Sequence, residues 1–268
     1  MIYFVSTPIG NLEDITLRAI KTLESSDIIY CEDTRTSKKL LDAYDIKAKL
    51  SSYHKFNEKE RLDEIISKAL DGLTISIISD AGMPAISDPG NILINSLIEN
   101  NIEYTVLPGP SAFTTALVLS GFDNSEFKFF GFFPSKDKDR KNLIEKIKKD
   151  SCTTIFYESP HRIFKTLEFL SENISDHNIA VVREISKIHE DIKIFKAKDY
   201  KDMDIVDKGE IVLLIDKYDK IEVVDDEFIK DKMLNLLSEG LTKKSAIKIL
   251  QKELNINKNK LYDISLEI

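Results

Sequence analysis

The stretch TISIISDAGMPAISDPG, residues 74–90, decides how the first half of this chain folds. It begins with Ile75, Ile77 and Ile78, an apolar run that is typical of a buried strand. It then changes to a segment rich in Gly, Pro, Asp and Ser, residue types that favour turns. In an open α/β sheet, ligands bind outside the carboxyl ends of the strands. The stretch therefore predicts one buried strand and, directly after it, one wall of a binding site.

The segments on both sides repeat this alternation of strand and helix. We expect strands over residues 2–6, 28–31, 74–79 and 104–107. We expect one helix that is capped by Asp14 or Thr16 and ends near residue 24, and further helices over residues 57–70, 92–100 and 111–120. Strands that alternate with crossover helices predict a parallel sheet. We assign residues 1–118 to this N-terminal α/β domain.

A second α/β domain with more antiparallel character is expected over residues 119–218. Its predicted strands are 127–133, 153–157, 179–183 and 210–215, with 187–195 as an edge strand. Lysines and an arginine dominate residues 136–149, which include a predicted helix, and we interpret them as a solvated face. The neighbouring Phe129, Phe130, Phe132 and Phe133 are expected in the core. Residues 225–268 predict a small helical module, with Gly240 as a C-cap and Thr242 and Asn257 as N-caps.

Composition excludes several classes of protein. The 268 residues are 42% hydrophobic and 31% charged, an ordinary globular mixture, and no apolar run is long enough to span a membrane. Cys31 and Cys152 are too few for a disulfide framework, and the four histidines form no metal-binding pattern, so we expect no metal. The N-terminus has no signal-peptide pattern, and we expect a cytoplasmic protein. The net charge of −8 disfavours generic nucleic-acid binding, although the charge is segregated along the chain.

Three loops are expected to converge on one pocket. Residues 7–11, 80–90 and 108–112 each follow a predicted strand, and Ser111 begins a helix whose N-terminus could bind an anion. The chain lacks both the Gly-x-Gly-x-x-Gly and the P-loop patterns, which argues against a common dehydrogenase or a P-loop NTPase. In the second domain, Glu158, His161 and Arg162 lie at the end of a strand, where they either hold a phosphate, orient a nucleophile or cap a helix with solvent-facing charges. Glu184, after Arg183, is either a site edge or half of an ion pair.

Long, ordered motifs carry a resemblance to a known family. The segments are STPIGNL (6–12), EDTR (32–35), His54 with Asn57 and Glu58, SDAGMP (79–84), SDPG (87–90), LPGPSA (107–112), GFFP (131–134), FYESPHR (156–162) and GEIVL (209–213). With them the chain resembles, from residue 3 to its end, the bacterial small-subunit rRNA 2′-O-ribose methyltransferases of the tetrapyrrole-methylase superfamily. Met83 and Ala85 depart from the residues usual in that family.

The resemblance implies a fold, a cofactor and a substrate. It implies a class III methyltransferase in which S-adenosylmethionine lies in a cleft between two α/β domains, in a homodimer. The implied substrate is the ribose 2′-hydroxyl of a cytidine in the decoding region of 16S rRNA (cytidine 1402 in the usual numbering). The helical module is then a candidate rRNA-contacting element.

The resemblance also implies roles for individual residues. The residues expected to bind the cofactor are Pro8, Asp80, Gly82, Met83, Ile86, Ser111, Ala112 and Tyr157. Arg35, Lys136 and Arg140 are expected to hold rRNA phosphates. Catalytic candidates are Glu158, His161, Arg162 and Glu184, and the sequence does not choose among them.

Three rival functions are weighed against this one. A porphyrin or corrin methylase would carry a Gly-rich stretch after the first strand, which residues 7–11 lack. A non-catalytic RNA-binding or ribosome-assembly protein would have no use for the cofactor-type loops. A nucleotide-binding oxidoreductase is disfavoured by the missing Gly-x-Gly-x-x-Gly pattern.

Overall fold

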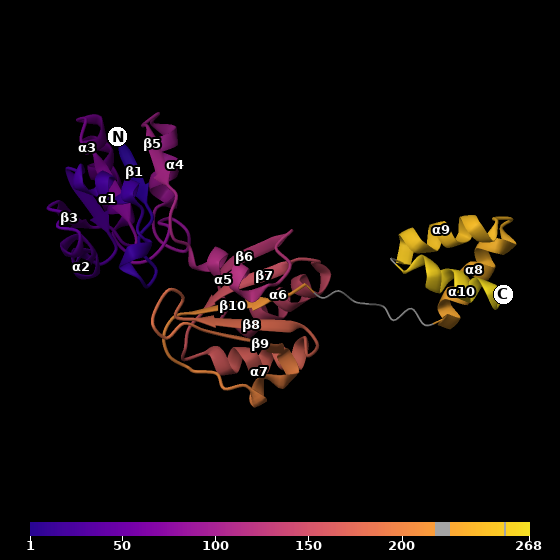
Figure 1. Cartoon of the computed structure of the whole chain (residues 1–268). Coiled ribbons are helices and arrows are strands. Elements are labelled where there is room, and N and C mark those ends of the chain that lie inside the picture. The colour runs from indigo at the N-terminus through magenta and orange to yellow at the C-terminus, as the bar shows by residue number, and fades with distance from the viewer. Residues whose placement is uncertain (218–225, 255) are drawn as a thin grey trace. The chain divides into compact units, whose positions relative to one another are not determined.

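The computed structural model describes residues 1–217, 226–254 and 256–268 of the chain. These residues form two compact units, Met1–Tyr218 and Asp219–Ile268 (Figure 1). The first unit contains two five-stranded sheets, and the described part of the second unit is helical. The predicted α/β fold class with an added helical module is confirmed.

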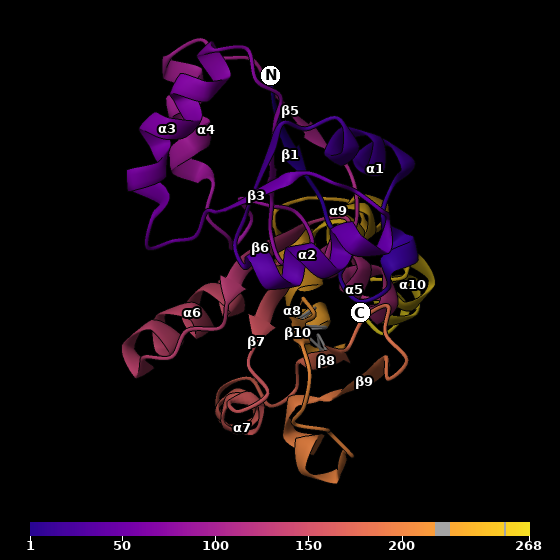
Figure 2. The same ribbon diagram turned by 90° about the vertical axis from the view of Figure 1, so that its left-hand side faces the viewer.

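The first sheet is entirely parallel, with the strand order β3-β2-β4-β1-β5. Its elements are β1 (Ile2–Val5), α1 (Leu17–Glu24), β2 (Ile28–Cys31), α2 (Thr34–Ala43), β3 (Lys49–Ser52), α3 (Glu58–Leu70), β4 (Ile75–Ile78), α4 (Asn91–Glu99) and β5 (Tyr104–Leu107). Leu23 of α1 and Leu41 of α2 pack on one face, while Ile65 of α3 and Leu93 of α4 pack on the other. Helices α3 and α4 are in contact, and Figure 2 shows them side by side. Because helices cover both faces of the sheet, strands β2 and β4 are buried along their whole length.

The second sheet is mixed, with the order β6-β7-β10-β8-β9 and a single parallel pair, β6 with β7. Its elements are α5 (Ala112–Ser120), β6 (Phe127–Phe132), α6 (Asp137–Lys149), β7 (Thr153–Glu158), α7 (Ile163–Asn173), β8 (Asn178–Arg183), β9 (Asp191–Lys196) and β10 (Ile211–Ile215). Helices α6 and α7 cover one face, and Ala116 and Leu117 of α5 pack on the other. The predicted domain boundary at residue 118 falls inside α5.

Two elements of the first sheet were not predicted from the sequence. Strand β3 is a polar edge strand, Lys49 to Ser52, without the apolar run that identifies a buried strand. Helix α2 begins in the polar segment after β2, where Asp33 caps it by accepting a hydrogen bond from the backbone N–H of Arg35 at 2.8 Å. Strand β3 offers little hydrophobic periodicity, and in α2 the buried leucines, Leu40 and Leu41, come only after a polar first half.

The helical module contains α8 (Asp226–Ser238), α9 (Lys243–Leu254) and α10 (Lys258–Leu266), as the capping residues predicted. Gly240 has φ +85°, and the side chain of Asn257 accepts a hydrogen bond from the backbone N–H of Asn259 at 2.9 Å. Met233, Leu250 and Leu261 lie in its small core. Across the described residues, no helix combines the length and the apolar character needed to cross a bilayer.

Candidate functional site

The loop after β1 is fastened to the loop after β4 by main-chain hydrogen bonds. The N–H of Thr7 donates to the carbonyl of Gly82 at 2.9 Å, and the N–H of Gly82 donates back at 3.0 Å. Gly82 has φ +80°, a conformation that glycine adopts without strain. The Ser6 hydroxyl reaches the loop after β5, donating to the carbonyl of Pro110 at 2.8 Å. The structure thus brings together the three loops that the sequence analysis singled out.

These loops and the second sheet enclose a cavity of about 430 Å³, within the 300–1,000 Å³ that is typical of small-molecule sites. The first half of the chain contributes Ile9, Asp80–Met83, Ile86–Asp88 and Ser111–Phe113. The strands of the second sheet and their adjoining loops contribute Phe132, Tyr157–Pro160 and Gly209–Val212. Most of these side chains are apolar, and the acidic ones come from both halves. The cavity therefore suits a ligand with a large apolar surface and a cationic group.

Every residue expected to bind the cofactor borders this cavity except Pro8. Asp80, Gly82, Met83, Ile86, Ser111, Ala112 and Tyr157 all line it, whereas Pro8 lies between Thr7 and Ile9 without reaching it. Ile9 and Asp88 also line the cavity, and both belong to loops that were expected to form the pocket, Asp88 as a hydrogen-bond acceptor or a partner for positive charge. Phe113, Phe132 and Gly209–Val212 line it as well, and the sequence did not predict a place at the site for them. The sequence did indicate that Gly209–Val212 matter, because they belong to the family motif GEIVL (209–213).

Carboxylates at the cavity repel one another and lie partly out of water. Burial, and then the negative charge of Glu32, raise the pKa of Asp88 to about 6. Burial also raises the pKa of Asp80, and of Glu32 beside it. Burial and then the charge of Asp88 raise the pKa of Tyr157 to about 12, so its hydroxyl keeps its proton at neutral pH. Placing a positive charge here would relieve the repulsion and favour the ionised carboxylates.

Glu158 borders the cavity, but its carboxylate is turned into the protein. The side chain is 0% exposed, and its oxygens accept hydrogen bonds from the N–H of Ser159 at 2.6 Å, from Arg162 at 2.5 Å and from the hydroxyl of Thr166 at 2.6 Å. The main chain of Glu158 is therefore what faces the cavity. The cluster holds the turn between β7 and α7.

His161 and Arg162 do not border the cavity. His161 is exposed, and Arg162, besides pairing with Glu158, donates to the carbonyl of Phe133 at 3.2 Å. Of the four catalytic candidates, the structure brings Glu158 and Arg162 together as a pair.

Glu184 lies apart from them and supports the edge of the cavity. Its Oε1 accepts hydrogen bonds from Nζ of Lys187 at 2.8 Å and from the N–H of Glu210 at 2.9 Å, and the bond from Lys187 holds the pKa of Glu184 below its ordinary value. Gly209 makes this arrangement possible, since a Cβ there would lie 2.5 Å from the Glu184 side chain. Glu184 thereby fixes Gly209 and Glu210 at the cavity.

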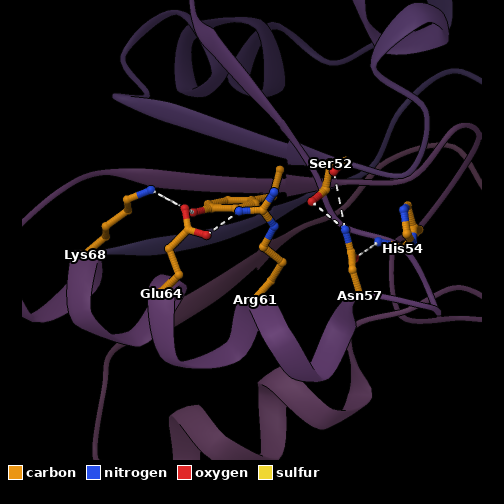
Figure 3. A network of polar contacts seen from close by, with 7 residues as sticks. Ser52, His54, Asn57, Arg61, Glu64 and Lys68 are labelled. Atoms are coloured by element: carbon orange, nitrogen blue, oxygen red, sulfur yellow. Dashed lines mark hydrogen bonds and ion pairs between the residues drawn. The ribbon is translucent and has the colours of Figure 1, made fainter.

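The motif of His54, Asn57 and Glu58 builds the start of α3, and Figure 3 shows His54 and Asn57 there with Ser52. Asn57 accepts a hydrogen bond from the N–H of His54 at 2.7 Å and donates to Ser52. Glu58, buried, accepts hydrogen bonds from the hydroxyl of Tyr53 at 2.9 Å and from the N–H of Gly90 at 2.8 Å. The bond to Gly90 anchors the far end of the 80–90 loop, so this motif supports the cavity from outside.

The three residues expected to hold rRNA phosphates lie outside the cavity lining. Arg35 is exposed and pairs with Asp33 at 2.7 Å, and this pairing lowers the pKa of Asp33 to about 2. Lys136, also exposed, precedes α6. Arg140 is more enclosed, because its Nε donates to the carbonyl of Pro134 at 2.9 Å and its guanidinium lies 5.7 Å from the centre of the Phe169 ring. Within the described residues, no group of three His, Cys, Asp or Glu side chains is arranged to hold a metal ion.

The expectation that Phe129, Phe130, Phe132 and Phe133 belong to the core is wrong for Phe130, which is 39% exposed, and for Phe132. Phe133 is buried, but the side chain of Phe132 is 60% exposed and borders the cavity.

Comparisons with known proteins agree on the family of this chain. The family of tetrapyrrole (corrin/porphyrin) methylases matches residues 1–200. The protein named ribosomal RNA small subunit methyltransferase I of Bacillus subtilis (strain 168) is 38% identical over 272 residues, covering 98% of this chain and 93% of that protein. The protein of the same name from Haemophilus influenzae is 39% identical, covering 99% of this chain and 96% of that protein.

Solved structures support the fold. Diphthine synthase superposes with a TM-score of 0.66 at 14% identity, covering 80% of this chain and 89% of that one. The uroporphyrin-III-C-methyltransferase of Thermus thermophilus superposes with a TM-score of 0.56 at 17% identity, covering 81% of this chain and 94% of that one. This chain belongs to the tetrapyrrole (corrin/porphyrin) methylase family and is a methyltransferase.

Proposed function

We propose that this enzyme transfers a methyl group from S-adenosylmethionine to the ribose 2′-hydroxyl of a cytidine in 16S rRNA, cytidine 1402 in the usual numbering. The observation that carries the proposal is the similarity, along nearly the whole chain, to proteins named ribosomal RNA small subunit methyltransferase I. The choice of the 2′-hydroxyl and of the nucleotide rests on the family resemblance of the motifs. The substrate proposed is the assembled small subunit.

The cavity fits S-adenosylmethionine in size and in chemistry. Ile9, Met83 and Val212 provide apolar surface for a purine ring, while Asp80 and Asp88 provide negative charge for a sulfonium or an ammonium group. When bound, the cofactor supplies an electrophilic methyl group. The chain itself contributes position, since the Thr7–Gly82 hydrogen bonds and the Glu184 contact to Glu210 fix opposite walls of the cavity.

The same resemblance supports proposals about the domains of the chain, its oligomeric state and its contacts with rRNA. We divide the chain into residues 1–118, 119–218 and 225–268, and propose that it acts as a cytoplasmic homodimer. Arg35, Lys136 and the helical module are proposed to contact rRNA phosphates. For Arg140, the contacts to Pro134 and Phe169 favour a role in holding α6 instead.

The direct test of the function is methyl transfer from labelled S-adenosylmethionine to small subunits that lack the modification. We expect label in 16S rRNA as a 2′-O-methylcytidine of the decoding region, mapped by nuclease digestion and mass spectrometry. Subunits that already carry the modification are the control and should stay unlabelled. Cofactor binding without label in either sample would contradict the rRNA assignment, and labelling of a small tetrapyrrole would replace it.

Replacing Asp88 by Asn should stabilise the cofactor-free protein and weaken cofactor binding. The pKa of about 6 lies above the ordinary 3.8, so the folded chain binds this proton more tightly than the unfolded chain. The cost of ionising Asp88 therefore grows as the pH rises from about 4 to about 6. Asp88→Asn should raise the free energy of unfolding by about 1–3 kcal/mol at pH 7 and change it little at pH 4.

Asp88→Asn should also change the affinity for the cofactor, which it should lower at pH 7. A cationic ligand favours ionised Asp88, so the affinity of the native protein should rise between pH 5 and pH 7, and Asp88→Asn should flatten this rise. Calorimetric titration measures the affinity of the native protein and of Asp88→Asn at each pH. The matched control is Asp63→Asn, at an exposed carboxylate of α3. An unchanged pH dependence in Asp88→Asn would contradict the placement of the cationic group.

Glu158 is proposed to hold the β7–α7 turn and to take no part in proton transfer. Glu158→Gln should lower the free energy of unfolding by about 2–4 kcal/mol, because a buried acceptor of three hydrogen bonds loses its charge beside Arg162. Glu145→Gln, at an exposed carboxylate 3.8 Å from Lys148, should cost less than about 0.5 kcal/mol. Denaturant unfolding measures both variants. Full stability of Glu158→Gln together with lost turnover would instead assign its carboxylate to the chemistry.

A further inference from the structure

Four aromatic rings from α5, β6 and β7 form a continuous row beside the cavity. Phe113 stacks on Phe129 with 4.5 Å between ring centres, and Phe129 meets Tyr157 edge to face at 4.9 Å. Tyr157 in turn meets Phe132 edge to face at 5.7 Å. The first three rings are partly buried, whereas Phe132 is 60% exposed. The row therefore ends in an aromatic ring that is open to solvent at the cavity.

An irregularity in β6 brings Phe132 to this position. Phe129 pairs with Ile155 and Phe132 with Tyr157, so three steps along β6 oppose two steps along β7. Gly131, with φ +72°, lies in the bulge. In a regular strand, residues three apart point to opposite faces, but here Phe129 and Phe132 both contact Tyr157. Bulges commonly re-aim a side chain beside a functional site.

The other exposed rings of β6 do not share this position. Phe130 points to the opposite face and stacks on Phe156 at 5.3 Å. Phe127, 42% exposed at the start of the strand, does not border the cavity. All three rings are exposed to solvent, but among them only Phe132 borders the cavity.

We infer that Phe132 is the platform on which the base of the target nucleotide stacks while its ribose is presented to the cavity. This inference rests on the proposed function and names a residue that binds the substrate of that reaction. Every base has an apolar face that stacks on an exposed aromatic ring, and single-stranded RNA is commonly held in this way.

Charge indicates which part of an RNA can reach this ring. Asp80, Asp88 and Glu210 border the same cavity, and their negative charge disfavours a phosphate there. A base and its ribose carry no charge and can enter. The exposed Lys136 follows Phe132 by four residues, outside the cavity lining, where a phosphate would meet a cation. The arrangement therefore favours a nucleotide with its base on Phe132 and its phosphates outside.

The test compares Phe132→Ala, Phe132→Leu and Phe132→Trp with the wild type and with Phe127→Ala as matched control. For each protein we would measure kcat and KM for small subunits that lack the modification, and the Kd for S-adenosylmethionine. Stacking predicts that Ala and Leu at position 132 raise KM about 5- to 100-fold. Phe132→Trp and Phe127→Ala should stay within about threefold of the wild type, and the cofactor Kd should not change in any variant.

The outcomes separate this inference from the proposed function. A wild-type enzyme that binds the cofactor and leaves the subunits unmethylated removes the proposed function. If the wild type methylates them and Phe132→Ala behaves like Phe127→Ala, only the platform is overturned. A weakened cofactor Kd in Phe132→Ala would also overturn it, since the ring would then contact the cofactor. Full activity of Phe132→Leu would show that apolar bulk suffices, and would equally contradict stacking.

Discussion

The cavity depends on the pair of main-chain hydrogen bonds between Thr7 and Gly82. These bonds join the loops after β1 and β4, neighbouring strands of the first sheet, into one wall. Ser6 extends the wall to Pro110, and Glu58 secures its far end at Gly90. Because the contacts to Thr7, Pro110 and Gly90 involve backbone atoms, loop side chains such as Met83 remain available to a ligand.

The opposite wall is held by two glutamates, Glu158, which is fully buried, and Glu184, which is partly buried. Glu158 and Glu184 each accept hydrogen bonds from the N–H of the residue that shapes the cavity edge, Ser159 in one case and Glu210 in the other. Their neighbours Arg162 and Lys187 neutralise them. Acidic residues near a methyltransferase cavity thus divide into two kinds. Glu158 and Glu184 are paired with cations, while Asp80 and Asp88 border the cavity and have raised pKa values.

Much of the fold was predictable because its signal is local. The isoleucine run of β4 and the turn residues after it identify a buried strand and its loop from sequence alone. Strand β3 did not follow from the sequence because most of its residues are polar, and helix α2 did not because its first six residues are polar. The position of Phe132 depends on a bulge whose register is set by β7, and the orientation of Glu158 depends on Thr166, so neither follows from the sequence around the residue itself.

We propose that the loops of both sheets form one site for the cofactor. Hydrogen–deuterium exchange with and without S-adenosylmethionine tests it most directly. We expect slower exchange in residues 80–88, 111–113, 157–159 and 209–212, which lie in both halves of the first unit and border the cavity. Exchange in α1 and in α8–α10 should not change. Protection confined to one sheet, or to segments away from the cavity, would contradict a shared site.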